Sequence, residues 1–329
     1  MKIAIIGASG LVGQKMLQLL QERDFKADEV LLAASERSIG KQVRYKGNML
    51  TILSISEVLE KAPEIVMFSA GSTVSKTWAP KFAASGCTVI DNSSAWRMHD
   101  EIPLIVPEVN ASILKKNDKI IANPNCSTIQ LVHVLWPLHQ KYELERVVVS
   151  TYQSVTGSGM NGIAQLDAER KGEISRLAYP HQIDLNCLPH GGDFLENGYT
   201  SEEMKLVNES RKILGIPALR LTSTVVRVPV KGGHSEAVNI EFKQLPDVDK
   251  VRSILSNVSG MIVQDDVSEN RYPMPILAEE RDETFVGRIR ADESEPKAVN
   301  LWIVADNLRK GAATNAVQIA EYLLKNALV

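Results

Sequence analysis

The sequence has few cysteines, and it has no long run of apolar residues or of charges of one sign. Its three cysteines, Cys87, Cys126 and Cys187, are widely spaced, and they form no CxxC pair or histidine-rich cluster. This spacing argues against a disulfide framework or a structural zinc site, predicts no bound metal, and is typical of thiols in a reducing cytosol. Lys and Arg number 37 against 40 Asp and Glu. We therefore expect no nucleic-acid surface and no polybasic membrane anchor.

The first residues, MKIAIIGASG, begin directly with a strand and lack the basic region, apolar stretch and cleavage site of a signal peptide. No segment reaches the apolar length of a membrane span. The 329 residues, of which 44% are apolar, are long for one core and predict about two domains. These features favour a soluble cytoplasmic enzyme.

A glycine-rich turn follows the first predicted strand, residues 2–6. Gly7, Gly10 and Gly13 have the spacing G-x-x-G-x-x-G before a helical run at 14–21. In a strand–turn–helix setting such glycines let the backbone approach a pyrophosphate at a helix N-terminus. A glycine triplet by itself also fits a simple tight turn, so the α/β context carries the prediction of a dinucleotide site.

That context continues along the chain. Strand-like runs at 30–34, 65–69 and 88–91 alternate with helical segments such as 74–85, which predicts a Rossmann-type doubly wound parallel sheet. Beyond Cys126, longer β-branched runs with irregular connections predict an α+β domain with a mixed or antiparallel sheet: 146–153, 221–228, 237–242 and 300–304. The amphipathic segment 312–324 is expected to dock on the first domain. The predicted domains are 1–125 with 308–329, and 126–307.

The end of the second strand bears on which dinucleotide is bound. Residues 35–38 read SERS, where Glu36 suits a ribose hydroxyl, and Arg37 with Ser38 suits a 2′-phosphate. We favour NADP, and the alternative is that Arg37 is a solvated loop charge.

Cys126 stands in NPNCSTIQ, between a strand ending near residue 122 and an apolar helical run. The open N–H groups and the dipole of a helix start favour the thiolate, which is the nucleophilic form. Cys87 and Cys187 lack this setting, and we expect both to be small buried hydrophobes.

A thiolate enzyme with a dinucleotide also needs an oxyanion donor, an acid/base and a substrate anchor. Gln153 ends a strand before a Gly-rich turn and suits the first role, although such a Gln often only satisfies backbone. His234 lies in a glycine loop before a strand, where we expect an exposed, mobile acid/base. Arg227 in an apolar strand and Arg97 after a strand end suit carboxylate or phosphate, or ordinary salt bridges. The other histidines are expected to be structural.

Several motifs together resemble the aspartate-β-semialdehyde dehydrogenase family. They run through the whole chain in order: GASGLVG at 7–13, DNSSAWRM at 91–98, NPNCSTIQ at 123–130, YQSVTGSG at 152–159, ENGYTSEEMK at 196–205, RVPVKGGHSEA at 227–237 and NLRKGAATNAVQIA at 307–320. One departure is LPHGGD at 188–193, where Gly191 and Gly192 make the local backbone hard to predict.

The resemblance implies roles for individual residues. Cys126 resembles the nucleophile, Gln153 the residue that orients the acyl intermediate, and His234 the acid/base. For the substrate, Arg227 resembles the carboxylate anchor, Glu202 the amino-group partner, and Lys205 with Arg97 the phosphate pair. Glu203 is the alternative to Glu202, but the spacing to Lys205 favours Glu202 on a shared helix face. The implied cofactor residues are Gly7, Ser9, Gly10, Leu11, Val12, Gly13, Arg37, Ser38, Ser69, Gly157, Ser158 and Asn307.

The implied reaction is reduction of L-aspartyl-4-phosphate by NADPH to aspartate semialdehyde and inorganic phosphate, through a thioester on Cys126. The step leads to lysine and diaminopimelate, threonine and methionine, and the family forms homodimers or dimers of dimers. The alternatives are an N-acetyl-γ-glutamyl-phosphate reductase or a glyceraldehyde-phosphate-type dehydrogenase, and an inactive dinucleotide-binding paralogue. An inactive paralogue is expected to lack Cys126, Gln153 or His234, and all three are present.

Overall fold

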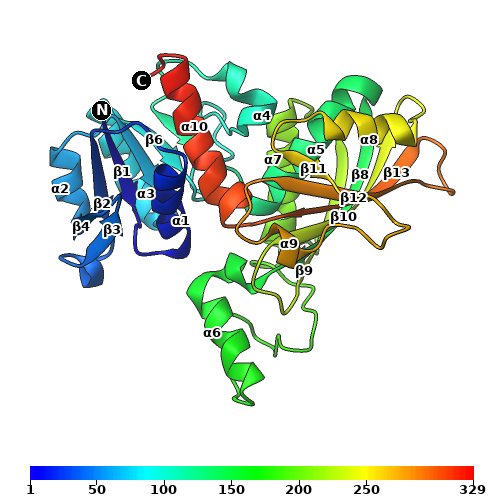
Figure 1. Cartoon of the computed structure of the whole chain (residues 1–329), viewed down its shortest axis with the longest axis horizontal. Helices are drawn as coiled ribbons and strands as arrows, with labels where there is room; N and C mark the ends of the chain where they lie inside the picture. The colour runs from blue at the N-terminus through cyan, green and yellow to red at the C-terminus, as the bar shows by residue number, and fades with distance from the viewer. The chain divides into compact units, whose positions relative to one another are not determined.

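The computed structural model describes residues 1–329, which form two compact units. The first unit contains Met1–Asn125 and Ala312–Val329, and the second contains Cys126–Gly311 (Figure 1). The prediction placed the return to the first unit at residue 308, whereas the structure places it at Ala312. Cys126 is therefore the first residue of the second unit.

The first unit is built on a seven-stranded sheet with the order β3-β4-β2-β1-β5-β6-β7. All neighbouring strands are parallel except β3 and β4. The strands are β1 (Lys2–Ile6), β2 (Glu29–Ala33), β3 (Gln42–Tyr45), β4 (Asn48–Leu53), β5 (Ile65–Phe68), β6 (Thr88–Asp91) and β7 (Ile120–Ala122). The predicted doubly wound sheet is confirmed.

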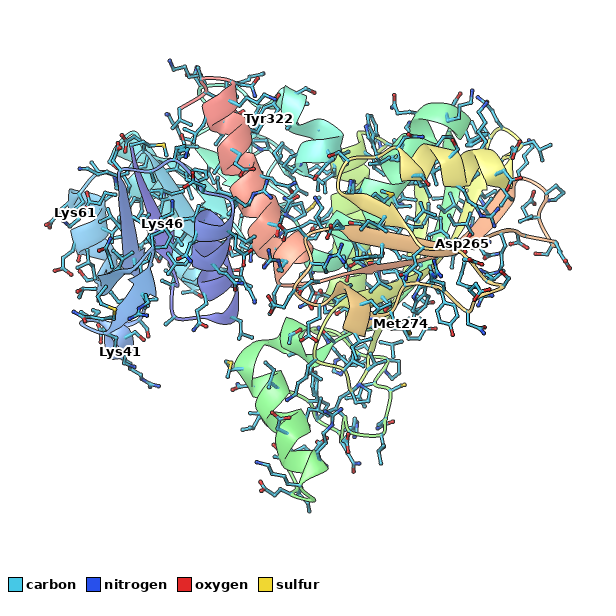
Figure 2. All side chains as sticks on the ribbon, in the orientation of Figure 1. Lys41, Lys46, Lys61, Asp265, Met274 and Tyr322 are labelled. Atoms are coloured by element: carbon cyan, nitrogen blue, oxygen red, sulfur yellow. The ribbon has the colours of Figure 1, made fainter.

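The β3–β4 hairpin at the edge of this sheet was not predicted. Its turn is Lys46-Gly47, and both residues have positive φ, at 45° and 83°. Such a turn matches the twist of a two-residue hairpin, and the dipeptide is a weaker signal than Asn-Gly. Lys41 and Lys46 are exposed beside these strands (Figure 2). Lysines at the two ends of an edge strand discourage its pairing with another chain.

Helices cover both faces of the first sheet. Along β1, Ile3 and Ile5 belong to one buried cluster, whereas Ala4 and Ile6 belong to another. The first cluster includes residues of α1 and α10, and the second includes residues of α2 and α3. The helical segments of this unit are α1 (Leu11–Glu22), η1 (Glu36–Ser38), α2 (Ile55–Glu60), α3 (Ser72–Ala84), α4 (Pro107–Asn110), η2 (Ala111–Ile113) and α10 (Thr314–Lys325). The alternation explains why a strand buried on both sides reads as a continuous apolar run.

The second unit contains a mixed six-stranded sheet with the order β11-β12-β13-β10-β8-β9. The pairs β8–β9 and β11–β12 are parallel, and the others are antiparallel. The strands are β8 (Leu144–Gln153), β9 (Arg220–Arg227), β10 (His234–Phe242), β11 (Met261–Val263), β12 (Thr284–Ala291) and β13 (Ala298–Ala305). The predicted mixed sheet is confirmed, although β11 and β12 were missed. In β12, Gly287, Arg288 and Arg290 interrupt the apolar pattern near a register shift.

Helices α5, α7 and α8 lie along one face of this sheet (Figure 1). The helical segments of the second unit are α5 (Cys126–Tyr142), η3 (Val155–Ser158), α6 (Gly159–Arg170), α7 (Ser201–Leu214), α8 (Val248–Ser256) and α9 (Pro275–Ala278). A π-helical segment, η4 (Arg309–Ala313), leads from the second unit into α10. None of the helices is both long enough and apolar enough to span a membrane.

Candidate active site

Cys126 is the first residue of α5, as the sequence predicted. Its side chain is half-buried, and the backbone of Gly311 lies directly against it. A Cβ atom at Gly311 would be 2.9 Å from Cβ of Cys126, so any larger residue there would displace the thiol. A helix of 17 residues thus begins at the candidate nucleophile, where its dipole favours negative charge.

Gln153 is tied to the same helix start. It is the last residue of β8 and is fully buried, and its Nε2 lies 2.9 Å from Oγ of Ser127, next to Cys126. Its Oε1 has no hydrogen-bond partner. An amide can meet Ser127 in either orientation, by donating from Nε2 or by accepting the hydroxyl proton at Oε1. In the second orientation Nε2 becomes the available donor, as an oxyanion requires.

His234 differs from its prediction, because it is neither exposed nor in a mobile loop. It is the first residue of β10 and is fully buried. The main-chain N–H of Ser154 donates to its Nδ1 over 3.0 Å. Since Nδ1 accepts this bond, the proton of the neutral ring is on Nε2, which is buried and has no partner. The ring therefore offers one donor, Nε2–H, to whatever occupies the site.

The charge state of His234 follows from these surroundings. Burial, and then the positive charge of Arg227, lower the pKa of His234 from 6.5 to about 3, and Glu202 opposes this shift. The imidazole is consequently neutral at neutral pH. The same effect shows that the charges of Arg227 and Glu202 act at the ring.

The η3 turn brings these groups together. A Cβ atom at Gly157 would lie 2.6 Å from Nη1 of Arg227 and 3.0 Å from Nε2 of His234. Asn307 also fixes the turn, because its Oδ1 accepts hydrogen bonds of 3.0 Å from the hydroxyl groups of both Ser154 and Thr156. The absence of a side chain at Gly157 leaves space beside the guanidinium and the imidazole.

Arg227 ends β9 and is largely buried. Its Nη1 donates to the main-chain carbonyl of Ser154 over 3.0 Å, and no carboxylate forms an ion pair with it. The main-chain bond fixes the guanidinium while leaving its charge unneutralised. A buried cation held in this way suits a carboxylate ligand, which can accept two parallel N–H bonds.

Glu202 and Glu203 in the first turn of α7 have different tasks. Glu202 forms an ion pair of 2.8 Å with Lys205. Glu203 closes a capping box with Thr200 and accepts the main-chain N–H of Val225 over 3.0 Å. Because Glu203 is already committed to the fold, the geometry favours Glu202 as the substrate partner. Gly191 packs on this helix, where a Cβ atom would be 2.7 Å from Val225 and 3.1 Å from Glu202.

Arg97 belongs to the first unit and is buried in the loop after β6. Its Nη2 donates to the carbonyl of Asn92 over 2.9 Å. Asp91 organises the same loop, since it accepts bonds from the hydroxyl of Ser75 and from the main-chain N–H of Ser93. Burial raises the pKa of Asp91, and the hydrogen bonds from Ser75 and Ser93 and the charge of Arg97 oppose this increase.

The glycine loop of the first unit has the shape of a phosphate site. Gly7 has φ of 92°, and a Cβ atom on it would be 2.3 Å from the carbonyl of Ser69. A Cβ atom on Gly13 would be 2.2 Å from the carbonyl of Gly7. Helix α1 begins at Leu11 after Gly10, and no side chain caps it. Ser9 and Gly10 are exposed, and Leu11 and Val12 are half-buried, so the N–H groups of this turn are accessible to an anion.

The remaining predicted cofactor residues divide between the units. In the first unit, Arg37 is exposed and Ser38 is buried in η1, which follows β2, and Ser69 follows β5. In the second unit, Ser158 accepts a bond of 2.9 Å from the hydroxyl of Tyr179. The carboxyl ends of β2, β1 and β5, where the strand order reverses, are the usual dinucleotide position in such sheets.

The burial of the other two cysteines was predicted correctly for Cys87 and wrongly for Cys187. Cys87 is buried, and burial raises the pKa of its thiol. Cys187 is exposed, so the expectation that it is buried is wrong. It lies in an irregular segment, where the neighbouring Leu185 is also exposed, and a short apolar stretch in a loop does not determine burial.

Three residues of the site were missed: Ser127, Ser154 and Gly311. Ser127 and Ser154 directly follow Cys126 and Gln153, so adjacency along the chain was the available signal. Gly311 contacts Cys126 from a segment distant in sequence, and no local pattern reveals that contact.

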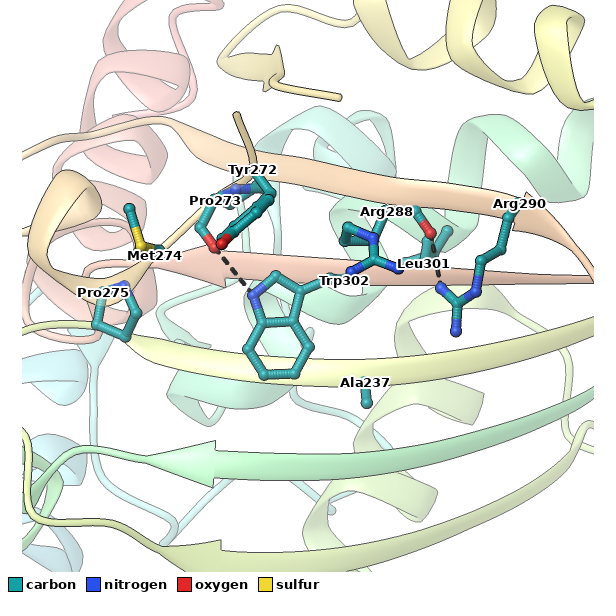
Figure 3. A pocket seen from close by; sticks show the side chains of 9 residues that line it. All are labelled: Ala237, Tyr272, Pro273, Met274, Pro275, Arg288, Arg290, Leu301 and Trp302. Atoms are coloured by element: carbon teal, nitrogen blue, oxygen red, sulfur yellow. Dashed lines mark hydrogen bonds between the residues drawn. The ribbon is translucent and has the colours of Figure 1, made fainter. Parts of the chain in front are cut away.

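A pocket of about 350 Å³ in the second unit contains none of the predicted site residues. In Figure 3 the indole N–H of Trp302 donates to the carbonyl of Pro273 over 3.1 Å, and Arg290 donates to the carbonyl of Arg288 over 2.8 Å. The pocket is lined by Ala237, Tyr272, Pro273, Met274, Pro275, Arg288, Arg290, Leu301 and Trp302. Ala237 alternates with His234 and Glu236 along β10, so the pocket lies on the sheet face opposite the catalytic candidates.

Comparison with known proteins agrees with the geometry. Residues 2–117 match the family model of the semialdehyde dehydrogenase NAD-binding domain, and residues 135–310 match that of the semialdehyde dehydrogenase dimerisation domain. The aspartate-semialdehyde dehydrogenase of Aquifex aeolicus is 49% identical, with 100% of this chain and 99% of the relative covered. The chain belongs to the aspartate-semialdehyde dehydrogenase family.

Other members of the aspartate-semialdehyde dehydrogenase family give the same result. The enzyme of Legionella pneumophila is 46% identical over 100% of this chain and 97% of its own length. Aspartate semialdehyde dehydrogenase II from Vibrio cholerae has a TM-score of 0.95 at 44% identity, covering 99% of this chain and 98% of that one. A further structure of the Vibrio cholerae enzyme is described as complexed with ASA. The predicted family, its fold and its class, an oxidoreductase, are confirmed.

Proposed function

We propose that the chain catalyses the NADPH-dependent reduction of L-aspartyl-4-phosphate to L-aspartate-4-semialdehyde, with Cys126 as the nucleophile. The observation that supports this most directly is the grouping, within one unit, of the Cys126 helix start, the buried Nε2–H of His234 and the unneutralised guanidinium of Arg227. A thiol, a proton donor and a carboxylate anchor are the groups that acyl reduction of an amino-acid phosphate requires.

The first half-reaction forms a thioester. The Cys126 thiolate attacks the acyl carbonyl, the carbon–oxygen bond to the phosphate breaks, and inorganic phosphate leaves. Gln153, fixed against Ser127, donates to the carbonyl oxygen as negative charge develops on it. We assign the departing phosphate to Arg97 and Lys205 on the family resemblance, and both are cationic.

The second half-reaction releases the aldehyde. NADPH, when bound, supplies the hydride that reduces the thioester carbonyl. The oxyanion left by hydride addition then collapses to the aldehyde, the carbon–sulfur bond breaks, and Cys126 leaves as its thiolate. His234, the assigned acid/base, stabilises the departing sulfur with a hydrogen bond from its Nε2–H. The neutral ring suits this role, because its Nε2–H is present at neutral pH and donates a hydrogen bond without giving up the proton.

Substrate orientation is assigned to two charged groups near the ring. Arg227 binds the α-carboxylate through its guanidinium, and Glu202 receives the α-ammonium group. Both charges already act on His234, which supports their placement at the same ligand.

The glycine loop supports a bound dinucleotide, because side chains at Gly7 or Gly13 would fill it. In this proposal Ser9–Val12 hold the pyrophosphate, and Arg37 with Ser38 holds the 2′-phosphate of NADP. Ser69, Gly157, Ser158 and Asn307 complete the assigned cofactor residues.

We also propose that the enzyme is a cytoplasmic homodimer, which can pair further into a dimer of dimers. The match of residues 135–310 to the dimerisation-domain model supports the dimer. So does the outer face of the second sheet, where Tyr152 is exposed and its ring contacts Trp302 at 5.3 Å between centroids. Light scattering on the purified protein gives the assembly directly. A monomer at micromolar concentration would contradict this part of the proposal.

The thioester step has a test of its own. With aspartate semialdehyde and NADP but no phosphate, the enzyme is expected to produce a burst of about one reduced cofactor per Cys126 and then stop, because nothing releases the acyl group. Added phosphate restarts turnover. Steady turnover without phosphate, or no burst at all, would contradict the mechanism.

A further inference from the structure

Glu236 is a fully buried glutamate that the mechanism above does not use. It is the third residue of β10, on the same face of the strand as His234, Val238 and Ile240, which are all buried. Neither of its carboxylate oxygens has a hydrogen-bond partner that satisfies both distance and angle. A buried acid with no cation beside it is costly to maintain in its charged form.

The neighbours of Glu236 carry no charge. Thr151 lies opposite on β8, Ile303 lies opposite on β13, and Gln130 approaches from α5. Burial raises the pKa of Glu236 well above its usual value, and only Gln130 opposes the shift. The titratable group on the same face of β10 is His234, which is itself neutral. Burial therefore favours the protonated, neutral form of this carboxyl group.

Gln130 links this acid to the candidate catalytic residues. Its Nε2 donates to the main-chain carbonyl of His234 over 3.4 Å, which is a long bond that needs support to hold the amide in place. Gln130 also follows Cys126 by one helical turn on α5. On β8, Thr151 precedes Gln153 on the same face. Gln130, Thr151 and Glu236 are thus all fully buried, and they come from the same three elements, α5, β8 and β10, as Cys126, Gln153 and His234.

We propose that Glu236, as a neutral carboxylic acid, is a positioning residue that holds Gln130 and, through it, the His234 main chain. Neither oxygen of Glu236 nor Oγ1 of Thr151 is bonded in the structure, so the proposal requires side-chain rotation. After it, the carbonyl oxygen of Glu236 accepts from the second Nε2 hydrogen of Gln130, and its hydroxyl donates to Oγ1 of Thr151. The arrangement keeps Nε2 of His234 aimed at the acyl group. This inference rests on the proposed function for its kinetic consequence, but not for the protonation of Glu236.

The protonation is tested without any substrate. The infrared difference spectrum of the wild-type protein minus Glu236→Gln, at neutral pH, is expected to contain the C=O stretch of one neutral carboxylic acid. A pair of carboxylate bands in its place would overturn the proposal. This readout is also independent of whether the proposed reaction is correct.

The positioning role is tested by kinetics in the phosphate-dependent reaction with aspartate semialdehyde. Glu236→Gln, which keeps a neutral donor and acceptor, is expected to retain kcat within about threefold. Glu236→Ala and Gln130→Leu are expected to lower kcat on the order of tenfold or more, with KM for NADP unchanged. Glu241→Ala, a glutamate on the opposite face of β10, serves as the control.

Two kinetic results would contradict the proposal. One is normal kcat in Gln130→Leu, because the link to His234 would then be dispensable. The other is a loss in Glu236→Gln as large as that in Glu236→Ala, because a charge would then be required. If Glu236→Ala does not fold, Gln130→Leu and the infrared spectrum still decide. If the wild type itself shows no turnover with this aldehyde, the proposed function fails, while the infrared result stands by itself.

Discussion

The main-chain N–H of Ser154 donates to Nδ1 of His234 over 3.0 Å, and this one bond determines where the imidazole proton lies. Ser154 also accepts from Nη1 of Arg227 through its carbonyl and reaches Asn307 through its hydroxyl. One residue of a tight turn therefore orients the candidate acid and the candidate carboxylate anchor together. The functional side chains are placed by main chain, which a point substitution at Ser154 would leave largely intact.

The lowered pKa of His234 predicts a specific loss of stability in acid. The ring is neutral in the folded protein down to about pH 3, whereas an unfolded histidine binds a proton below 6.5. Between these values the unfolded chain binds more protons, so stability is fully present above pH 6.5 and falls as the pH decreases. At about pH 4.5 the contribution lost is roughly 2 to 3 kcal/mol.

The measurement is urea unfolding at neutral pH and at about pH 4.5 for the wild type and His234→Gln. The glutamine can still accept the Ser154 N–H, but it cannot titrate. We expect the variant to lose less stability than the wild type on acidification. Equal losses in the two proteins would show that His234 is not buried in its neutral form.

Gly157→Ala is expected to damage the site without unfolding the protein. The added methyl group would stand 2.6 Å from Nη1 of Arg227 and 3.0 Å from Nε2 of His234, between two of the candidate site residues. We predict a decrease in kcat/KM for aspartate semialdehyde on the order of tenfold or more, and a nearly unchanged thermal midpoint. Met160→Ala, an exposed position nearby in sequence, is the control and should behave as wild type. Normal kinetics in Gly157→Ala would show that no ligand of the site needs the space beside this turn.

Glu202→Gln and Glu203→Gln are predicted to affect different properties, the first KM and the second stability. Glu202→Gln removes the proposed partner of the substrate ammonium group, so it should raise KM for the semialdehyde. Glu203→Gln weakens the capping of α7, so it should lower the free energy of unfolding by about 1 kcal/mol and change KM little. Kinetics and urea unfolding on both variants decide. If Glu203→Gln carried the KM effect, the assignment of the two residues would be reversed.

Arg37→Ala tests the preference for NADP. Removing a guanidinium from the 2′-phosphate should weaken NADP binding on the order of tenfold, and NAD binding should stay the same. Arg44→Ala removes another exposed arginine of the first unit and provides the control for general charge. Titration calorimetry with both nucleotides gives the comparison. A parallel loss for NADP and NAD would assign Arg37 to a different part of the cofactor.

The sequence predicted features that depend on local pattern and missed those that depend on distant contacts. The start of α5 at Cys126 and the ends of β8 and β9 at Gln153 and Arg227 follow from periodicity, and all three are confirmed. The exposure of His234 was predicted wrongly, because the flanking Gly232 and Gly233 suggested a loop. The residue instead begins β10, which pairs with β13 on one edge and β8 on the other, and its side chain is fully buried.

Glu236 shows how such an error could have been avoided. It lies at every-second-residue spacing from His234, Val238, Ile240 and Phe242, so these residues share one face of the strand. The inward face could therefore have been recognised from residue 234 onward. A glutamate in that alternation conflicts with the apolar pattern, and such conflicts tend to mark functional positions. The contact of Gly311 with Cys126, in contrast, depends on the tertiary structure alone.

The most direct test of the account is phosphate-dependent reduction of NADP by aspartate semialdehyde, followed through the absorbance of the reduced nicotinamide. We predict turnover with the wild type, loss of that turnover in Cys126→Ser, and little activity with N-acetylglutamate semialdehyde. Unchanged turnover in Cys126→Ser, or activity with the N-acetylated aldehyde alone, would contradict the assignment of nucleophile or substrate respectively.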